Sequence, residues 1–306
     1  MRTVRNLTKS EDHHGIAVET IPIPQANSIL NDNNHHHLAE WEEKYPSDAY
    51  HKRYMNERNK TCFTTYYKPE LDSFFHSPPI FIHKLSKQEC NVLRSAMKNG
   101  MLNGVKSLER DSDLNDLINE ITDKIGKDKK NLFFRFSSCS PKDSLVREES
   151  SIIGASDVRT WLMAACQSQR SFLSFDDEES LVFSEYNHKC ESRYEWRVFV
   201  NKGKITAMSQ YNCYKYVGAD AWDLISLALA IVNFHNQIKP MFSVESYVLD
   251  VLALPTESKE KWDVKLIELN PFGINLSSGS GCFSWLTDKD ALYSSDEITV
   301  RIVRNE

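Results

Sequence analysis

Two carboxylates and an amide fall within the pattern of a strand hairpin near the end of the 306-residue chain. Asp250 interrupts the apolar run YVLDVLAL, and Glu268 and Asn270 follow two positions apart in WDVKLIELNP. Residues i and i+2 of a strand share one face, so a hairpin turning at 255–261 would set Asp250 opposite residues 266–268. Oxygen ligands of this kind suit Mg²⁺, which keeps other positions for water and substrate phosphates. The pattern therefore indicates a magnesium site.

The same residues also fit a purely structural explanation. A charged side chain in an apolar strand is costly unless it is paired or binds a cation. Asp250 would then pair with a basic neighbour such as Lys265, and Asn270 with Pro271 would form a plain turn. The spacing of the residues leaves both explanations open.

A second segment with binding chemistry is FFRFSSCSPKDS, at residues 133–144. Arg135 ends a strand-like run, and four small residues at 137–140 precede Lys142 and Asp143. Small residues let backbone N–H groups approach an anion closely, and Arg135 or Lys142 would supply positive charge. The GxxxxGK[ST] pattern of a P-loop is absent, so a serine-rich surface turn is the alternative explanation.

A third segment, FSEYNHKCESRYEWRVFVNKGKI, ends one strand at Glu185 and Tyr186 and begins the next with Glu195 and Arg197. Glu195 and Arg197 also stand two positions apart, so both face the same side of their strand. A pair of this kind is commonly a salt bridge on the face of a sheet. By itself it does not separate a structural role from a binding role.

Alternating helical and strand-like patterns supply the elements that would hold these residues. Ser86 and Glu89 form a capping box, which predicts a helix running to about Lys98 and stopping near Gly100. The segment NKGK at 201–204 predicts a hairpin turn. The other predicted elements are strands at 79–83, 132–136, 181–186, 194–200 and 205–211, helices at 114–121, 157–166 and 219–238, and a strand hairpin made of 244–254 and 262–270.

Composition and charge argue against several classes of protein. The sequence is 41% hydrophobic with a formal net charge of −6, which supports a sizeable core and disfavours a nucleic-acid-binding surface. The longest apolar run, at 224–234, has about half the length of a membrane span, and no apolar block marks an N-terminal secretory signal. Seven scattered cysteines without CxxC spacing favour reduced thiols. We expect a cytoplasmic protein without membrane or direct nucleic-acid contacts.

By composition the chain divides into three regions. Residues 1–75 are polar and rich in Asn, and we expect them to be partly ordered or to wrap over a later domain. The histidines at 35–37 indicate a solvated tract, because consecutive residues do not converge on one ion without other ligands. Residues 76–180 form a front α/β lobe, and residues 181–306 form a strand-rich C-terminal lobe. The predicted fold class is α+β, with two lobes that meet at a cleft.

The order of these segments resembles the ATP-grasp fold. The matching stretches are SEY at 184–186, EWRVFVNKGK at 195–204, LDV at 249–251 and IELNP at 267–271. The resemblance implies a hinge for adenine and ribose, then a charged strand, then a hairpin that carries Asp, Glu and Asn ligands for Mg²⁺. It also implies an ATP and Mg²⁺ cleft between antiparallel sheets of the two lobes.

Within that fold the chain is similar to the cell division cycle protein 123 family, as a divergent member. The similarity covers residues 130–286 and rests on three matches. The first is FRFSSCSPKDS, which aligns without gaps to the family's PKLNWSAPRDA. The second is EWRVFV with MSQYNC, which resembles the family's EFRCFV with ISQRDY, and the third is LDV with ELNPF, which resembles FDV with DFNPW. IPIPQ at 21–25 resembles an early LPLPQ segment. The chain departs from the family in having Arg135 for a lysine, Ser138 for a tryptophan and Tyr211 for an arginine.

The resemblance implies a role for each matching residue. It implies phosphate contacts by Arg135 and Lys142, and adenine and ribose contacts by Glu185 and Tyr186. Arg197 would face the phosphates or a substrate, and no catalytic residue is assigned. The resemblance implies that ATP and Mg²⁺ are bound by Arg135, Ser140, Lys142, Asp143, Glu185, Tyr186, Glu195, Arg197, Asp250, Glu268 and Asn270. The last three of these residues are the implied metal ligands.

Two functions follow from the resemblance. In the first, the protein binds Mg·ATP and acts as an assembly factor, or chaperone, for translation initiation factor 2 by binding its gamma subunit. The alternative is an ATP-grasp enzyme, which would be either a carboxylate–amine ligase or a transferase that modifies a protein with a phosphoryl or nucleotidyl group. One form of this alternative is a bacterial effector that mimics the host factor. Such chemistry needs a second pocket lined with positive groups, which the sequence does not identify. Assembly is therefore the preferred prediction, and enzymatic activity stays open.

Overall fold

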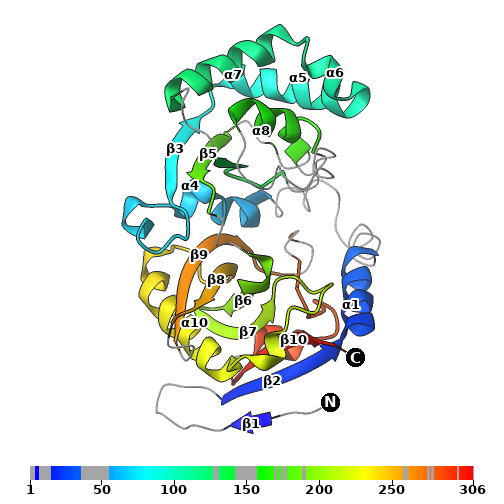
Figure 1. Cartoon of the computed structure of the whole chain (residues 1–306), viewed down its shortest axis with the longest axis vertical. Coiled ribbons are helices and arrows are strands. Elements are labelled where there is room, and N and C mark those ends of the chain that lie inside the picture. Colours follow the sequence, from blue (N-terminus) through cyan, green and yellow to red (C-terminus); the bar gives the residue numbers. More distant parts are fainter. Residues whose placement is uncertain are drawn as a thin grey trace. The chain divides into compact units, whose positions relative to one another are not determined.

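The structure is a computed structural model of the chain, and its described residues form two compact units (Figure 1). Unit 1 comprises Met1–Thr61, Phe74–His76 and Lys189–Glu306, and unit 2 comprises Cys62–Ser73 and Ser77–His188. The structure describes residues 4–6, 15–35, 55–126, 131–141, 157–168, 171–172, 175, 178–187, 191–257, 261–273, 276, 279–294 and 296–305.

The predicted domain boundaries differ from this division in two places. The predicted boundary between residues 180 and 181 falls at the beginning of strand β5 (Ser180–Glu185), which pairs with two strands of unit 2. Met1–Thr61 fall in unit 1, and strand β2 (Gly15–Pro22) is an internal strand of the unit 1 sheet.

Unit 2 is a three-stranded antiparallel sheet packed against helices. The strand order is β3 (Pro79–Lys84), β5, β4 (Leu132–Phe136). The helices are α4 (Phe63–Tyr66), η1 (Pro69–Leu71), α5 (Lys87–Asn103), α6 (Val105–Leu108), α7 (Ser112–Ile125) and α8 (Val158–Ala165). The apolar faces of α5, α7 and α8 join the strands in one core, at whose centre Phe134, Phe136 and Phe183 are fully buried. This core fixes the ends of β4 and β5, where the predicted unit 2 site residues lie.

Helix α5 confirms the predicted capping box but continues past its predicted end. The Ser86 hydroxyl accepts the Glu89 N–H at 3.2 Å, and the Glu89 carboxylate accepts the Ser86 N–H at 2.6 Å. The helix runs through Gly100 and ends at Gly104, whose φ of 73° suits glycine. Gly100 is a packing position, since a Cβ there would lie 2.5 Å from the Cys166 carbonyl oxygen. The glycine that the sequence suggested as a stop therefore allows α5 to approach the end of α8.

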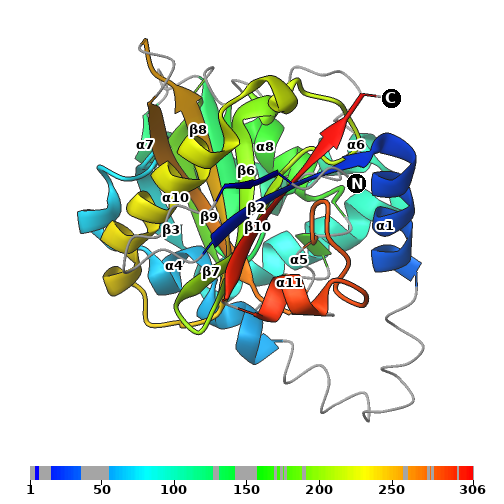
Figure 2. The same ribbon diagram turned by 90° about the horizontal axis from the view of Figure 1, so that it is seen from below.

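Unit 1 is built on a seven-stranded sheet with the order β1-β2-β10-β7-β6-β8-β9. Its other strands are β1 (Val4–Asn6), β6 (Glu195–Asn201), β7 (Lys204–Gln210), β8 (Tyr247–Pro255), β9 (Trp262–Pro271) and β10 (Glu297–Arg304). Strand β10 runs parallel to both of its neighbours, β2 and β7, whereas the other pairs are antiparallel. Figure 2 shows β10, in red, alongside the dark blue β2.

The helices of unit 1 lie between and beside these strands in the sequence. They include α1 (Ile23–His35), η3 (Ser192–Tyr194), η4 (Ala219–Ala221), α10 (Leu224–Ile238), η5 (Lys239–Met241) and α11 (Lys289–Tyr293). Helix α10 contacts β9 and β2. It contains the longest apolar run of the sequence yet has only 15 residues, and no helix in the described part of the chain is long and apolar enough to cross a membrane.

Both predicted hairpins form, and one predicted helix begins later than expected. The β6–β7 turn has positive φ angles at Lys202 (51°) and Gly203 (74°), the combination that a tight hairpin turn requires. Strands β8 and β9 pair antiparallel, as expected. The helix predicted at 219–238 is instead η4 followed by α10, because Trp222 is extended and Asp223 caps the new helix by accepting the Ser226 N–H at 3.0 Å.

Candidate functional site

A row of six polar residues crosses the unit 1 sheet at one level. Each member is the in-register partner of the next, so the six residues occupy one face of the sheet. All of them except the half-buried Glu19 are buried. We call them the polar row: Glu19 of β2, Arg301 of β10, Ser209 of β7, Arg197 of β6, Asp250 of β8 and Glu268 of β9.

At the centre of the polar row Arg197 and Asp250 form a bidentate ion pair. Arg197 Nε donates to Asp250 Oδ1 at 2.9 Å, and Arg197 Nη2 donates to Asp250 Oδ2 at 2.8 Å. Burial alone would lower the pKa of Arg197, but the charge and hydrogen bonds of Asp250 outweigh it and raise the pKa above its ordinary value. The Tyr211 ring, 4.8 Å from the guanidinium carbon, packs on the same cation. The basic partner of Asp250 is therefore Arg197, and the suggested alternative Lys265 lies in register with Leu252.

The two other predicted metal ligands adjoin this ion pair. Asn270 Nδ2 donates to Asp250 Oδ2 at 2.9 Å. The buried Glu268 is the in-register partner of Asp250 because a β-bulge skips Ile267 between the pairs Asp250–Glu268 and Val251–Leu266. The structure thus brings together the predicted residues Arg197, Asp250, Glu268 and Asn270.

The chemistry of this group bears on whether it would hold Mg²⁺. The Asp250 carboxylate accepts hydrogen bonds from Arg197 and Asn270, so it is already engaged with the protein. Glu268 and Asn270 add a second carboxylate and an amide oxygen, which are the donors that a hard cation prefers. No three His, Cys, Asp or Glu side chains of the described residues form a group that could hold a metal ion. A magnesium ion at this place would therefore depend on the amide oxygen, water and phosphate oxygens to complete its coordination.

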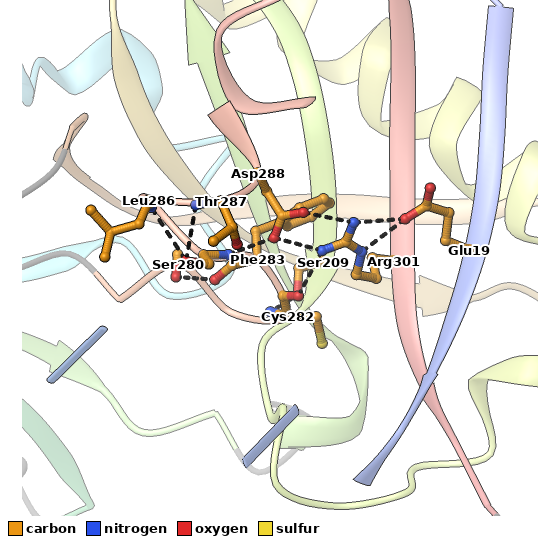
Figure 3. Close-up of polar contacts among 10 residues, drawn as sticks. Glu19, Ser209, Ser280, Cys282, Phe283, Leu286, Thr287, Asp288 and Arg301 are labelled. Carbon is orange, nitrogen blue, oxygen red and sulfur yellow. Dashed lines mark hydrogen bonds and ion pairs between the residues drawn. The ribbon is translucent and has the colours of Figure 1, made fainter. Parts of the chain in front are cut away.

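A short loop, Gly279–Cys282, crosses over the polar row, and we call it the glycine strap. Arg197 Nη1 donates to the Gly279 carbonyl at 2.6 Å. The Cys282 N–H donates to Ser209 Oγ at 2.9 Å, and Arg301 Nη1 donates to the Cys282 carbonyl at 3.2 Å. Figure 3 shows the last two of these contacts from β7 and β10 to the strap. Three members of the polar row therefore hold the same loop.

Two glycines of the strap lie against side chains of the polar row. Gly281 has a φ of 59°, and a Cβ there would lie 2.5 Å from Ser209 Oγ. At Gly279 a Cβ would lie 3.0 Å from Arg197 Nη1. The strap can approach the row this closely because both residues lack side chains.

The far end of the polar row is a second ion-pair cluster, centred on Arg301 (Figure 3). Arg301 donates to Glu19 Oε2 at 2.9 and 2.7 Å, and to the two Asp288 oxygens at 2.8 and 3.1 Å. The Phe283 ring lies 4.2 Å from its guanidinium carbon. Burial would lower the pKa of Arg301, but Asp288 and then Glu19 raise it overall. This cluster ties the N-terminal strand β2 to the segment that continues the strap.

The remaining predicted residue of unit 1 is Glu195, at the beginning of β6. Its register partner on β8 is Leu252, and its carbonyl accepts the Tyr211 N–H at 2.9 Å. That hydrogen bond places Tyr211 beside Arg197, so the backbone of Glu195 supports the Arg197 environment.

The other predicted residues belong to unit 2. The buried Arg135 donates from Nε to the Phe136 carbonyl at 3.1 Å, and its guanidinium carbon lies 5.6 Å from the centre of the Phe63 ring. Glu185 is exposed at the end of β5, and its carbonyl accepts a hydrogen bond from the Ser77 hydroxyl. The Tyr186 N–H donates to the Asn131 carbonyl at 2.7 Å. Ser140 is buried, whereas Lys142 and Asp143 lie outside the described residues.

Sequence reasoning missed half of the polar row. Ser209, Arg301 and Glu19 were not predicted, and neither was the strap. Arg301 stands in the segment EITVRIVR, where it occupies a polar position of an alternating strand pattern and does not interrupt an apolar run as Asp250 does in YVLDVLAL. The pattern alone therefore gave no signal that the charge of Arg301 is buried and paired.

The comparisons with known proteins agree with this architecture. The chain has the mixed α+β fold of C-terminally truncated Cdc123 from Schizosaccharomyces pombe, with a TM-score of 0.61 and 17% sequence identity over 82% of this chain and 98% of that one. Cdc123 from the same organism gives a TM-score of 0.58 with the same identity and coverage. A search of curated protein sequences finds no match.

The D123 family, by its sequence model, matches residues 145–306, which is more than half of the chain. The chain belongs to the D123 family, as the resemblance of its motifs implied.

Proposed function

We propose that this protein binds Mg·ATP in the manner of an ATP-grasp protein and acts as an assembly factor for translation initiation factor 2 through its gamma subunit. The observation that carries the proposal is the group of Arg197, Asp250 and Asn270, joined by hydrogen bonds, with Glu268 in register beside Asp250. The family membership of the chain supports the partner.

In unit 1 the proposal assigns the metal to Asp250, Glu268 and Asn270. When bound, Mg²⁺ would neutralise negative charge on the nucleotide phosphates. Asp250 is fully buried and held by Arg197, so its carboxylate is fixed before any ligand arrives. Glu268 contributes a second negative charge at the edge strand β9. Arg197 uses three of its five N–H donors inside the protein, so its proposed contribution is to orient Asp250.

In unit 2 the proposal assigns phosphate binding to Arg135 and Lys142, and adenine and ribose binding to Glu185 and Tyr186. Ser140 and Asp143 are assigned to the same nucleotide site without a specific contact. Arg135 and Glu185 lie on the paired strands β4 and β5, and the Leu132–Glu185 pair sets their register. The exposed Glu185 and the half-buried Tyr186 are accessible to a ligand at this end of the sheet.

Titration calorimetry with ATP and Mg²⁺ tests the nucleotide proposal. We expect Glu268→Ala and Asn270→Ala each to weaken the Mg²⁺-dependent affinity at least about tenfold, which corresponds to ~1.4 kcal/mol. Glu257→Ala, an exposed acid in the loop of the same hairpin, is the matched control and should bind as the wild type does. Unchanged affinity in the first two variants would refute the site, and no binding to the wild type would refute the nucleotide proposal.

A binding experiment with purified translation initiation factor 2 tests the partner. We expect the immobilised protein to retain the isolated gamma subunit, and ATP with Mg²⁺ to strengthen the complex. Mass spectrometry of the recovered subunit distinguishes assembly from enzymatic modification. Failure to bind the subunit would refute the assembly role, and a covalent phosphate or nucleotide on it would replace assembly with a transferase activity.

A further inference from the structure

The outer surface of helices α5 and α6 in unit 2 exposes three neighbouring apolar side chains. Met101 is 44% exposed, Leu102 is 73% exposed and Val105 is 36% exposed. Eight large hydrophobic side chains are exposed among the described residues, and three of them fall within these five positions of the sequence. Single exposed apolar residues are common on proteins, whereas a group of them marks an interaction site.

This exposure is a property of a helix whose other face is well packed. Leu93 and Gly100 are buried in the contacts of α5 with the rest of unit 2. Each residue of an α-helix is turned by about 100° from the one before, so Leu102 lies on the side opposite to Leu93. Gly104, with a φ of 73°, ends α5, and α6 begins at Val105. The core of unit 2 therefore holds the apolar group in place on the outside.

Three exposed cations accompany the apolar group. Lys98 and Leu102 stand at positions i and i+4 of α5, which are neighbours on a helix surface. Lys106 lies in α6, and Arg110 follows four residues later. None of the three cations forms an ion pair with a carboxylate that the structure describes. Glu109 is the one acid in the stretch 98–110, which carries three positive charges and one negative, a net charge of +2 within a chain of net charge −6.

We propose that this surface is where the protein partner docks, and that the partner presents apolar side chains flanked by carboxylates. The inference rests on the proposed function, whose partner is the gamma subunit of translation initiation factor 2. Apolar side chains at the centre of an interface supply much of its affinity, and unpaired charges around them speed association and select the orientation. We call the surface the α5–α6 patch, and it consists of Lys98, Met101, Leu102, Val105, Lys106 and Arg110.

A protein partner fits the α5–α6 patch better than an anionic membrane does. The patch contains no Trp, Tyr or Phe, which are the side chains that settle at membrane interfaces. Asn99 and Asn103 adjoin its apolar residues, and the apolar face of α5 is already buried in the core. The negative net charge of the chain would also oppose its approach to anionic lipid.

Surface plasmon resonance with the purified gamma subunit tests the apolar centre. Leu102→Asp should weaken the affinity at least about tenfold, because it places a charge where apolar side chains would meet. Leu102 is largely exposed, so the variant should unfold at the wild-type temperature. Ile80→Thr is the matched control, since it removes another exposed apolar side chain of unit 2, on β3, and keeps a β-branched residue there. Its affinity should equal that of the wild type.

The same measurement at several salt concentrations tests the charges. Lys98→Glu should slow association and reduce the dependence of the affinity on salt, because it reverses one of the charges that attract the partner's carboxylates. Lys87→Glu makes the same change at an exposed position in the first turn of α5, about 16 Å away along the helix. It should leave both the association rate and the salt dependence unchanged.

The results separate this docking surface from the proposed function itself. If the wild type binds the gamma subunit and neither Leu102→Asp nor Lys98→Glu weakens binding, the α5–α6 patch is not the docking surface. The inference is equally wrong if Leu102→Asp spares the gamma subunit but abolishes binding to phosphatidylcholine–phosphatidylserine vesicles or converts a dimer to a monomer in size-exclusion chromatography. A marked fall in the unfolding temperature of Leu102→Asp would show that the chain itself covers the patch. No binding of the gamma subunit to the wild type would overturn the assembly role and this inference with it.

Discussion

Arg197 and Asp250 face each other in register on β6 and β8 and form two parallel hydrogen bonds of 2.9 and 2.8 Å in the interior of unit 1. Fork-to-fork geometry of this kind is among the stronger forms of ion pair. The pair also explains how a carboxylate can be fully buried in an apolar strand, because Arg197 balances its charge and Asn270 satisfies a further lone pair. One of the proposed metal ligands, Asp250, is thus a carboxylate that is fixed and partly neutralised by the protein itself.

A double-mutant cycle at this pair should show strong coupling. Arg197→Met and Asp250→Leu should each lower the free energy of unfolding by about 3–5 kcal/mol, since each leaves an unpaired buried charge. The double variant should lose much less than the sum, because neither charge remains. Urea denaturation followed by tryptophan fluorescence measures this, as Trp196, Trp222, Trp262 and Trp285 all lie in unit 1.

The matched control for that cycle is the surface pair of Lys265 and Asp263, which lie 3.9 Å apart on β9. Their cycle should give a coupling energy of about 0–1 kcal/mol, as exposed ion pairs usually do. Additive losses for Arg197 and Asp250 would mean that the two charges are solvated, contrary to the buried pair described above.

The β8–β9 hairpin shows what spacing can and cannot predict. The positions of Asp250 and of the intervening loop were enough to place residues 266–268 opposite it, which the structure confirms. The bulge at Ile267, which selects Glu268, leaves no mark in the apolar pattern. Arg197 was recognised as a charged strand residue, but its pairing with Asp250 depends on β6 lying next to β8, which are not consecutive strands.

The parts of the fold that the sequence did not predict depend on contacts between distant segments. Strand β10 joins β2, a neighbour at the opposite end of the sequence, and the two run parallel. The strap follows from Gly279 and Gly281, but glycines are equally common in ordinary turns. By contrast Ser86 and Glu89 were predictable, because a capping box is encoded within four residues.

Gly281→Ala should destabilise the glycine strap. The substitution places a Cβ 2.5 Å from Ser209 Oγ at a φ of 59°, so it combines a steric clash with backbone strain. Gly203 has a similar φ of 74°, and a Cβ added there would have no atom within 4 Å, so Gly203→Ala measures the backbone strain alone. We expect a loss of roughly 1 kcal/mol at Gly203 and 2–4 kcal/mol at Gly281, measured by denaturation. Equal losses at the two positions would show that the strap does not lie against Ser209.

Gly100→Ala should reverse the usual helix preference. Alanine is favoured over glycine by about 1 kcal/mol in a helix interior, yet here its Cβ would lie 2.5 Å from the Cys166 carbonyl oxygen. We expect a net loss of stability in unit 2, whereas Ser95→Ala at an exposed position of the same helix should be neutral or slightly stabilising. Thermal unfolding of the two variants decides the point, and a stabilised Gly100→Ala variant would contradict the close approach of α5 and α8.

Acid should weaken unit 1 through His235. Burial, and then the nearby charge of Lys239, lower the pKa of His235 to about 4 in the folded protein. In the unfolded chain His235 has its ordinary pKa of about 6.5, so it binds a proton below that pH, whereas in the folded protein it stays neutral down to about pH 4. The free energy of unfolding therefore falls as the pH falls from about 6.5 to 4. The loss in the free energy of unfolding should approach roughly 3 kcal/mol near pH 4.

Comparison of the wild type with His235→Gln isolates that contribution. His235 lies 2.8 Å from the Tyr247 hydroxyl, and glutamine can keep a hydrogen bond there without titrating. The free energy of unfolding of the variant should fall less steeply between pH 6.5 and 4. The pKa of His76 is also lowered by burial, so some slope should remain. Identical pH profiles for the two proteins would mean that His235 is protonated in the folded state.

The place of β10 between β2 and β7 has a consequence for how the protein is made. The ribosome releases residues 15–22 long before residues 297–304, so β2 must remain without its parallel neighbour during nearly all of translation. Pairings between such distant segments form slowly and leave apolar strand edges exposed while they wait. Until β10 is synthesised, Glu19 has no Arg301 to bind, and the Cys282 carbonyl of the strap lacks the hydrogen bond from Arg301. We therefore expect the nascent chain to fold more efficiently when a chaperone covers β2 until β10 has been synthesised.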